Sequence, residues 1–211
     1  MHKKLKGLYA ITDAKLMGKN LLSMAEQAIN GGITILQYRN KMASITQQQQ
    51  EASALAALCK KNNVLFLVND NIELAIKVNA DGVHLGQSDT NLQQAREQLG
   101  DKIIGVTCHN DIELARLAQQ QGADYVAFGR FYSSQTKPSA PPAELSILTE
   151  AQKSLSLPVA AIGGITPETA AILLNQGADM LAVIHGIFAQ DDVFAASQQF
   201  VEIIDSPNEP V

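Results

Sequence analysis

The stretch Gly122-Ala123-Asp124-Tyr125-Val126-Ala127-Phe128-Gly129 decides the fold. It joins the end of a helix-like segment to a short apolar run. The glycine supplies the left-handed conformation that often ends a helix, and the small or acidic residues after it let the chain turn sharply into a strand. The same kind of junction recurs as Gly31-Gly32-Ile33, Ala80-Asp81-Gly82-Val83 and Gly177-Ala178-Asp179-Met180. Their spacing corresponds to one or two strand–helix units and not to a solenoid period.

Short apolar runs alternate with helix-like segments along the whole chain. The predicted strands are 8–12, 33–39, 65–69, 82–85, 103–107, 125–129, 159–162 and 180–184. The predicted helices are 21–29, 46–61, 72–78, 92–99, 111–120, 143–154, 167–175 and 193–204. Near-continuous apolar strands are typical of a parallel sheet that is buried on both faces and connected by helices. Eight such units predict an α/β protein with a (β/α)8 TIM barrel, and an open doubly wound sheet is the alternative.

The composition indicates a globular protein with one core. Of the 211 residues, 46% are hydrophobic and 18% charged, which excludes the disordered and fibrous classes. We expect a single domain over residues 1–204 and a flexible C-terminal tail over 205–211. The formal net charge is -5 and no basic block is present, so a nucleic-acid partner is disfavoured.

The cysteines and the apolar runs bear on the compartment. Cys59 and Cys108 lie far apart and outside any CxxC spacing, which indicates neither a disulfide framework nor a zinc site and fits a reducing compartment. No apolar stretch approaches about 18 residues, and the N-terminus lacks a small-residue cleavage site. The sequence therefore predicts a cytoplasmic protein that does not bind a membrane.

Polar residues collect directly after the predicted strands. In a TIM barrel the carboxyl ends of the strands form the rim that carries the active site. These residues are Gln37-Tyr38-Arg39-Asn40-Lys41, Asn69-Asp70-Asn71, His84-Leu85-Gly86-Gln87-Ser88-Asp89, Thr107-Cys108-His109, the loop from Gly129 to Lys137, Gly163-Gly164 and His185-Gly186. One rim should therefore hold cations, carboxylates and glycine turns together.

This combination indicates a phosphate pocket. Arg39, Lys41 and Lys137 offer charge-assisted donors to an anion, and a glycine pair before a helix leaves backbone N–H groups for phosphate oxygens. Asp70 and Asp89 come without a histidine or cysteine ligand set. Oxygen ligands near phosphate suggest Mg²⁺ rather than zinc.

Each of these residues also has a structural interpretation. Asp70 and Asp89 both precede predicted helices and would serve equally as N-caps. The lysines would be solvated charges, and Arg39 could cover a strand end with its aliphatic stem. His84 and His109 would be hydrogen-bonded rim residues, and Cys108 a small buried hydrophobe. The convergence of cations and carboxylates on one rim favours function, because capping does not require it.

The motifs together resemble the thiamine phosphate synthase family, from Leu8 to Ile184. The resemblance is carried by Leu8-Tyr9-Ala10-Ile11-Thr12-Asp13, Gln37-Tyr38-Arg39-Asn40-Lys41, Val68-Asn69-Asp70, the stretch from Gly82 to Asp89, Gly105-Val106-Thr107, Thr136-Lys137 and Ala161-Ile162-Gly163-Gly164-Ile165. It implies a (β/α)8 barrel that joins an aminopyrimidine methyl diphosphate to a thiazole phosphate and releases pyrophosphate with Mg²⁺. Both substrates are small molecules.

The resemblance also implies roles for individual residues. The pyrimidine diphosphate would be held by Gln37, Tyr38, Arg39, Asn40, Lys41, Asn69, Thr107 and Lys137. The thiazole phosphate would meet Ser134, Gln135, Thr136, Gly164, Ile184 and His185. Asp70 and Asp89 would bind Mg²⁺. Arg39, Lys41, Lys137 and Thr107 would be the catalytic residues, because in the family route pyrophosphate departs first and leaves a cation that the thiazole nitrogen captures.

The chain departs from the family pattern at a few positions. The family commonly has Pro-Thr at Ser133-Ser134, and a serine at both Thr107 and His185. Thr107 and Ser134 keep the hydroxyl, whereas His185 brings a larger side chain to the thiazole site. Two other functions therefore stay open: a thiazole tautomerase-like isomerase, and a non-catalytic barrel that binds a thiamine precursor.

Overall fold

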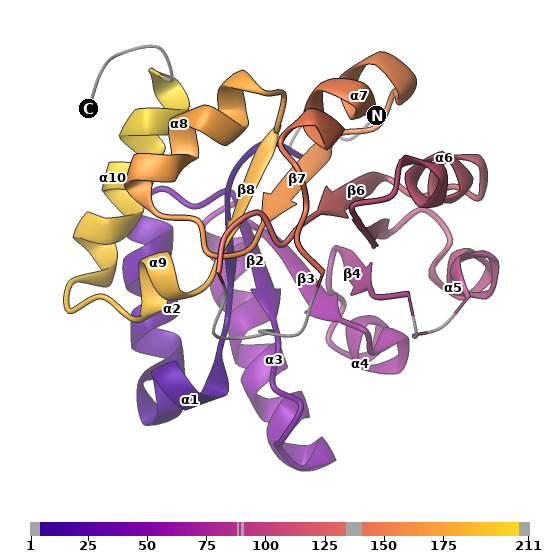
Figure 1. The fold of residues 1–211 in the computed structure, drawn as a ribbon. Helices are drawn as coiled ribbons and strands as arrows, with labels where there is room; N and C mark the ends of the chain where they lie inside the picture. Colours follow the sequence, from indigo (N-terminus) through magenta and orange to yellow (C-terminus); the bar gives the residue numbers. More distant parts are fainter. Residues whose placement is uncertain (1–4, 88, 90, 134–140, 207–211) are drawn as a thin grey trace.

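The structure, a computed structural model, describes residues 5–87, 89, 91–133 and 141–206. Eight parallel strands close into a barrel in chain order, and β8 pairs with β1 (Figure 1). The strands are β1 Gly7–Ile11, β2 Ile35–Tyr38, β3 Leu65–Asn69, β4 Gly82–Leu85, β5 Ile103–His109, β6 Tyr125–Phe128, β7 Val159–Ile162 and β8 Met180–Val183. The predicted (β/α)8 barrel is confirmed, and the open sheet was the wrong alternative.

Helices surround the strands on all sides (Figure 1). They are α1 Ala14–Met17, α2 Leu21–Asn30, α3 Ile45–Lys61, α4 Ile72–Lys77, α5 Leu92–Leu99, α6 Ile112–Gln120, α7 Ser146–Ser154, α8 Pro167–Asn175, α9 His185–Phe188 and α10 Val193–Asp205, with a 3-10 turn at Gly18–Asn20. The sequence did not predict α1 and α9, which have four residues each. Helix α7 begins three residues later than predicted, and α10 includes Asp205, the first residue of the predicted tail.

The repeated junctions fasten neighbouring strands at their amino ends. Asp81 accepts a hydrogen bond of 2.8 Å from the backbone N–H of Phe66, at the start of β3. Asp124 and Asp179 accept bonds of the same length from β5 and β7. Each aspartate therefore satisfies a backbone donor on the preceding strand, at the end of the barrel opposite to the predicted site. This is the physical reason for an acidic residue at three of the junctions.

The core has two layers. Ile35 faces the barrel interior, where it packs with Tyr9, Tyr125 and Met180. Leu36, the next residue, faces the larger apolar cluster between the strands and the helices. This alternation explains why the strands are apolar on both sides. Among the described residues no helix is long and apolar enough to cross a membrane, and the cytoplasmic location stays a prediction.

Candidate active site

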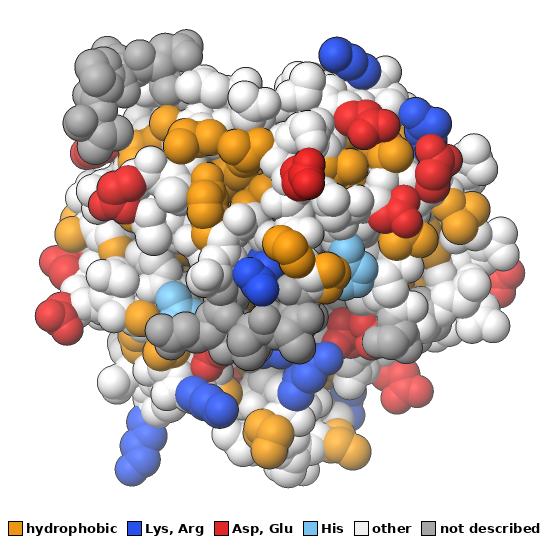
Figure 2. Space-filling model, in the orientation of Figure 1, with side chains coloured by type: hydrophobic (Ala, Val, Ile, Leu, Met, Phe, Trp, Pro, Cys, Tyr) orange, Lys and Arg blue, Asp and Glu red, His pale blue; other side chains and the backbone are white. Residues whose placement is uncertain are grey.

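A cavity of about 500 Å³ opens at the carboxyl ends of the strands. All eight strands, or the residues directly after them, contribute to its lining, as expected for a TIM barrel site. Its polar lining includes Gln37, Arg39, Asn69, His84, Thr107, His109, Arg130, Gly164 and His185, and its apolar lining includes Ile11, Ala127, Ile162, Ala182 and Ile184. Figure 2 shows several Lys and Arg side chains in the lower centre of this face of the molecule.

The stretch after β2 divides between the cavity and the helix layer. Gln37 and Arg39 line the cavity. Tyr38 and Asn40 point to the other side, where the Tyr38 hydroxyl donates to Glu51 of α3 at 2.7 Å and the Asn40 amide donates to the same oxygen at 3.0 Å. Successive side chains of an extended segment point to opposite sides, so Gln37 and Arg39 face the cavity while Tyr38 and Asn40 face the helices. Tyr38 and Asn40, which the resemblance placed on the substrate, are not part of the cavity lining.

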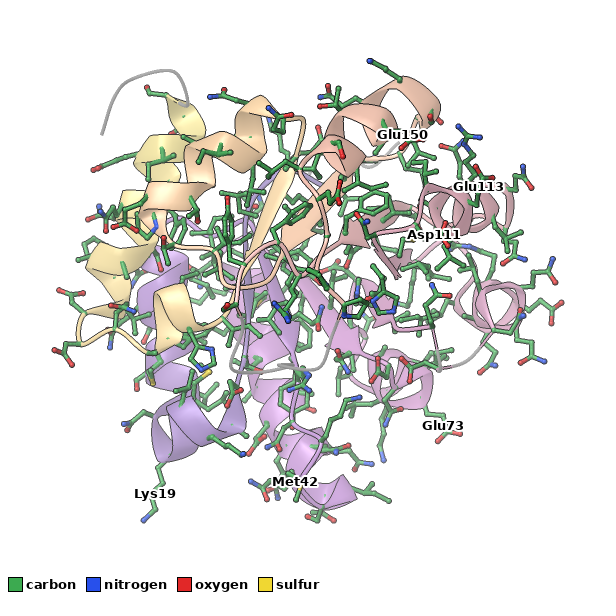
Figure 3. All side chains as sticks on the ribbon, in the orientation of Figure 1. Lys19, Met42, Glu73, Asp111, Glu113 and Glu150 are labelled. Atoms are coloured by element: carbon green, nitrogen blue, oxygen red, sulfur yellow. The ribbon has the colours of Figure 1, made fainter. Side chains whose placement is uncertain are left out.

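These outward residues support the ones that face the cavity. The side chain of Asn40 accepts hydrogen bonds from the backbone of Met42 and Ala43, which shapes the loop that carries Lys41. Met42 lies at the outer end of this loop, near the start of α3 (Figure 3), and is 88% exposed. The buried Thr12 hydroxyl accepts the backbone N–H of Arg39 at 2.8 Å. Thr12 is therefore a supporting residue that the sequence analysis missed.

Lys41, Asp70 and Asp89 form a charged cluster beside the cavity. The Lys41 Nζ lies 2.7 Å from Asp70 Oδ2, and the carboxyl groups of Asp70 and Asp89 are hydrogen-bonded to each other. Asp89 also accepts the backbone N–H of Gly86 at 2.7 Å. Burial raises the pKa of Asp89, and its contact with Asp70 raises it further. Burial opposes ionisation of Asp70 too, but the hydrogen bonds from Lys41 and Asp89 outweigh it and lower the pKa of Asp70.

The capping interpretation of the two aspartates is wrong. Asn71 is the N-cap of α4, and Asn91 is the N-cap of α5. Asp70 stands one residue before its cap with φ 61, a left-handed conformation that is uncommon outside glycine. Both carboxyl groups are thus available to each other and to Lys41. Among the described residues no group of three or more metal-ligating side chains occurs, so a cation here would take its remaining ligands from water or substrate.

An irregularity in β5 brings two residues of that strand into the cavity. The register shifts between Thr107 and His109, so that Cys108 is an extra residue in the strand. A bulge of this kind re-aims the side chain that follows it. Thr107 and His109 therefore both line the cavity, while Cys108 is fully buried, as the sequence predicted.

His84 is hydrogen-bonded through both ring nitrogens. Its Nδ1 lies 2.8 Å from the Tyr125 hydroxyl, and its Nε2 lies 2.8 Å from the Thr107 hydroxyl. The structural interpretation of His84 as a satisfied rim residue is confirmed. The Tyr125 hydroxyl lies 2.9 Å from that of Tyr9, which in turn accepts a hydrogen bond from Gln37.

The glycine pair after β7 has the geometry of an anion-binding turn. Gly164 has φ 64, and a Cβ there would clash with the carbonyl oxygen of Ser133. Among the described contacts the N–H groups of Gly164 and Ile165 donate to no protein acceptor. They stand before α8, whose amino end carries partial positive charge. The glycines thus permit both a close approach of the neighbouring loop and free backbone donors.

Four predicted site residues cannot be placed. Ser134, Gln135, Thr136 and Lys137 lie outside the described residues. Arg130, which begins the same loop, lines the cavity although the sequence analysis assigned it no role. Its position directly after β6 was the available signal, since residues there face the rim.

Known proteins resemble this chain in sequence and in fold. A family model for thiamine monophosphate synthase matches residues 8–187. The chain belongs to the thiamine monophosphate synthase family. The thiamine-phosphate synthase of Alcanivorax borkumensis is 53% identical over 194 residues, which cover 91% of this chain and 89% of that protein. The thiamine-phosphate synthase of Thioalkalivibrio sulfidiphilus is 48% identical over 204 residues, covering 96% and 97%.

A solved structure agrees with membership in the synthase family. The thiamine phosphate pyrophosphorylase from Pyrococcus furiosus superposes with a TM-score of 0.90 at 31% identity, and the match covers 98% of each chain. The predicted family and the predicted enzyme class, a transferase of thiamine biosynthesis, are confirmed.

Proposed function

We propose that this chain joins an aminopyrimidine methyl diphosphate to a thiazole phosphate, forming thiamine phosphate and releasing pyrophosphate. The observation that supports this most is the cluster of Lys41, Asp70 and Asp89, in which Lys41 and Asp70 closely follow Arg39 and Asn69 of the cavity lining in the chain. Cations and paired carboxylates suit a diphosphate that carries a divalent cation. An isomerase acting on the thiazole alone would not need this arrangement.

The carboxylate pair fits Mg²⁺. Two acidic side chains in contact are costly unless a proton or a cation lies between them, and the pKa of Asp89 is raised by burial and then by its contact with Asp70. Their oxygens are the ligands that Mg²⁺ prefers, and a Mg²⁺ site commonly has one or two carboxylates plus substrate phosphates. When bound, Mg²⁺ would neutralise charge on the departing pyrophosphate. Asp70 and Asp89 would hold it.

The protein's own groups then have defined tasks. The bond between the pyrimidine methylene carbon and the diphosphate oxygen breaks, and its electron pair leaves with pyrophosphate. Arg39 and Lys41, and Lys137 in the part of the loop outside the described residues, would stabilise the charge that develops there. The thiazole nitrogen then donates its lone pair to the methylene carbon, forming the new C–N bond. No proton transfer is required, which agrees with a site that needs no general base.

The apolar side of the cavity protects the intermediate. Ile11, Ala127, Ile162 and Ala182 line it and exclude water from a carbocation that water would otherwise capture. The phosphate of the thiazole would bind the N–H groups of Gly164 and Ile165. Ile184 and His185 line the same cavity, and His185 stands where the family usually has a serine. Ser134, Gln135 and Thr136 stay proposed contacts.

The test is pyrophosphate release by the purified protein. The aminopyrimidine diphosphate is supplied with and without Mg²⁺, and with and without the thiazole phosphate. We expect metal-dependent release and formation of thiamine phosphate. Absence of release, together with tight binding of the thiazole phosphate alone, would contradict the proposal and favour the isomerase or a precursor-binding barrel. Release without any requirement for a divalent cation would refute the metal assignment alone.

A further inference from the structure

Five polar side chains form a continuous chain of hydrogen bonds inside the barrel. The Gln37 side-chain amide donates to the Tyr9 hydroxyl. Tyr9 and Tyr125 are joined at 2.9 Å, Tyr125 and His84 at 2.8 Å, and His84 and Thr107 at 2.8 Å. The two tyrosine side chains are at most 1% exposed, and Tyr125 lies outside the cavity lining, whereas Gln37 and Thr107 line the cavity together with Tyr9 and His84. The buried Tyr125 hydroxyl therefore connects polar groups on two sides of the cavity wall.

Each hydrogen bond in this series contains one proton. The direction in which one bond is donated therefore fixes the direction of the next. Burial raises the pKa of Tyr9 and of Tyr125, so both hydroxyls keep their protons and each has one to donate. Because Tyr9 accepts from Gln37, its own proton goes to Tyr125, its other described partner. Tyr125 then donates to His84 Nδ1. With Nδ1 accepting, the imidazole carries its proton on Nε2 and donates to Thr107.

The two ends consequently present opposite hydrogen-bonding groups. The Thr107 oxygen accepts from His84, which leaves its hydroxyl proton for the cavity. The Gln37 nitrogen is used by Tyr9, and its carbonyl oxygen has no partner among the described residues. Gln37 thus offers an acceptor and Thr107 a donor. An aminopyrimidine has the complementary groups, an amino donor and ring-nitrogen acceptors.

A glycine in β5 makes room for the centre of the chain. A Cβ at Gly105 would stand well under 3.0 Å from the ring and the hydroxyl oxygen of Tyr125. Glycine weakens the interior of a strand, and one of its uses there is to admit a close approach. The Tyr125 ring also stacks on His84, with centroids 5.5 Å apart. Packing thus holds the tyrosine where both of its hydrogen bonds form.

We propose that Tyr9, Tyr125 and His84 are positioning residues, which fix Gln37 as an acceptor and Thr107 as a donor towards the pyrimidine. Their role is to orient the hydrogen-bonding groups of Gln37 and Thr107, and it requires no contact of their own with the ligand. They decide which ring is accepted, because replacing the amino group by an oxo group exchanges donor and acceptor on that edge of the ring. The identity of the ligand rests on the proposed function, whereas the direction of the hydrogen bonds is a property of the ligand-free protein.

The test reads the His84 tautomer by nitrogen NMR in protein labelled at histidine. The chain has four histidines, so the spectrum is simple, and a His84→Asn variant assigns the signal. In the wild type we expect the proton on Nε2. Gln37→Glu, studied at pH 8.5, replaces the donor by a carboxylate that only accepts, since an ordinary glutamate has a pKa of about 4.3. Every link should then reverse, and the proton should move to Nδ1.

Two further variants show whether the change at Gln37 reaches His84 through the hydrogen bonds of Tyr9 and Tyr125. Tyr125→Phe removes the middle hydroxyl, so adding Gln37→Glu to it should leave the tautomer as it is in Tyr125→Phe alone. Tyr9→Phe, which serves also if Gln37→Glu does not fold, should release the constraint and populate both tautomers. A wild-type proton on Nδ1, an unchanged tautomer in Gln37→Glu, or a tautomer change in the Tyr125→Phe background would each overturn the proposal.

A binding measurement tests whether this series of hydrogen bonds determines the selectivity for an aminopyrimidine. We expect the wild type to bind the 4-oxo analogue about 10- to 100-fold more weakly than the amino compound, because unmatched buried polar groups are costly. Tyr125→Phe should reduce this ratio at least several-fold. Tyr132→Phe is the matched control, since its hydroxyl is hydrogen-bonded to Thr169 and it does not line the cavity. An unchanged ratio in Tyr125→Phe would contradict the selectivity role, whereas failure of both pyrimidines to bind would contradict the proposed function.

Discussion

Substitution of Gly105 by alanine tests the packing beneath the cavity. Gly105 lies inside β5, and its missing Cβ is the space that the Tyr125 ring occupies. A Cβ would stand so close that the ring must move by about 1 Å or more to restore normal contact, in an interior packed at close to crystal density. Tyr125 is fully buried, so it has no open space to enter.

The cost can be worked out from the contacts that this movement breaks. The Tyr125 hydroxyl has bonds of 2.9 Å to Tyr9 and 2.8 Å to His84, and a shift of that size takes both beyond hydrogen-bonding distance. Two lost bonds contribute about 2 kcal/mol, and overpacking adds about 1–3 kcal/mol. We therefore expect Gly105→Ala to lower the free energy of unfolding by about 3–5 kcal/mol.

Chemical denaturation of Gly105→Ala measures this loss. Gly100→Ala is the control, because a Cβ there meets nothing within 4 Å and only the backbone conformation, with φ 57 and ψ -120, is unfavourable for alanine, which costs about 1–3 kcal/mol. Adding Tyr125→Ala to Gly105→Ala should recover part of the loss, so the two changes together should be less destabilising than their sum. A Gly105→Ala variant no less stable than Gly100→Ala would refute the reasoning.

Three further predictions concern other parts of the barrel. Asp70→Asn should reduce turnover at least 100-fold and raise the Mg²⁺ concentration needed for half-maximal activity. Glu73→Gln, on the outer side of α4 (Figure 3), is the control and should change neither. Equal activities of the two variants in a magnesium titration would contradict the metal assignment. Asp124→Ala should lower the free energy of unfolding by about 1–3 kcal/mol, because it leaves a backbone N–H of β5 without its acceptor, and Asp124→Asn should retain part of that bond; denaturation midpoints check both. Burial raises the pKa of Cys59 and Cys108 from 9.0 to about 12, so between these values both thiols stay neutral in the folded state but ionise in the unfolded state. The free energy of unfolding should therefore be highest below pH 9 and fall as the pH rises towards 12. A Cys59→Ala, Cys108→Ala double variant should show a smaller fall over the same pH range.

The fold was predictable because its signals are local and repeated. Eight apolar runs and their helices are each long enough to show a period, and the junction at Gly122-Ala123-Asp124 recurs. The helices α1 and α9 were missed, because four residues are too few to show a helical period. Helix α7 begins later than predicted because the backbone N–H of Ala143 donates to the carbonyl oxygen of Arg130, a contact between distant residues that the local pattern does not show.

The site was predictable as a set of positions but not as a set of contacts. Placing polar residues after strands found Arg39, Asp70 and Thr107. It could not separate Gln37 from Tyr38, because that distinction depends on which face of β2 is inward. Nor could it show that asparagines cap α4 and α5, or that β5 contains an extra residue. Those outcomes depend on register and on competition between neighbouring side chains, which a single sequence does not display.

The aspartates at the strand junctions have a consequence for the order of folding. Their bonds join residues only 15 to 20 positions apart, whereas closure of the barrel pairs Gly7 with Met180. Contacts between residues near in sequence cost less chain entropy and form early. We expect pulse-labelled hydrogen exchange to protect the amides of Phe66, Ile104 and Val159 before that of Gly7, and the reverse order would contradict this. The barrel would then assemble as pairs of strands fastened at one end, and its last seam would be the one between β1 and β8.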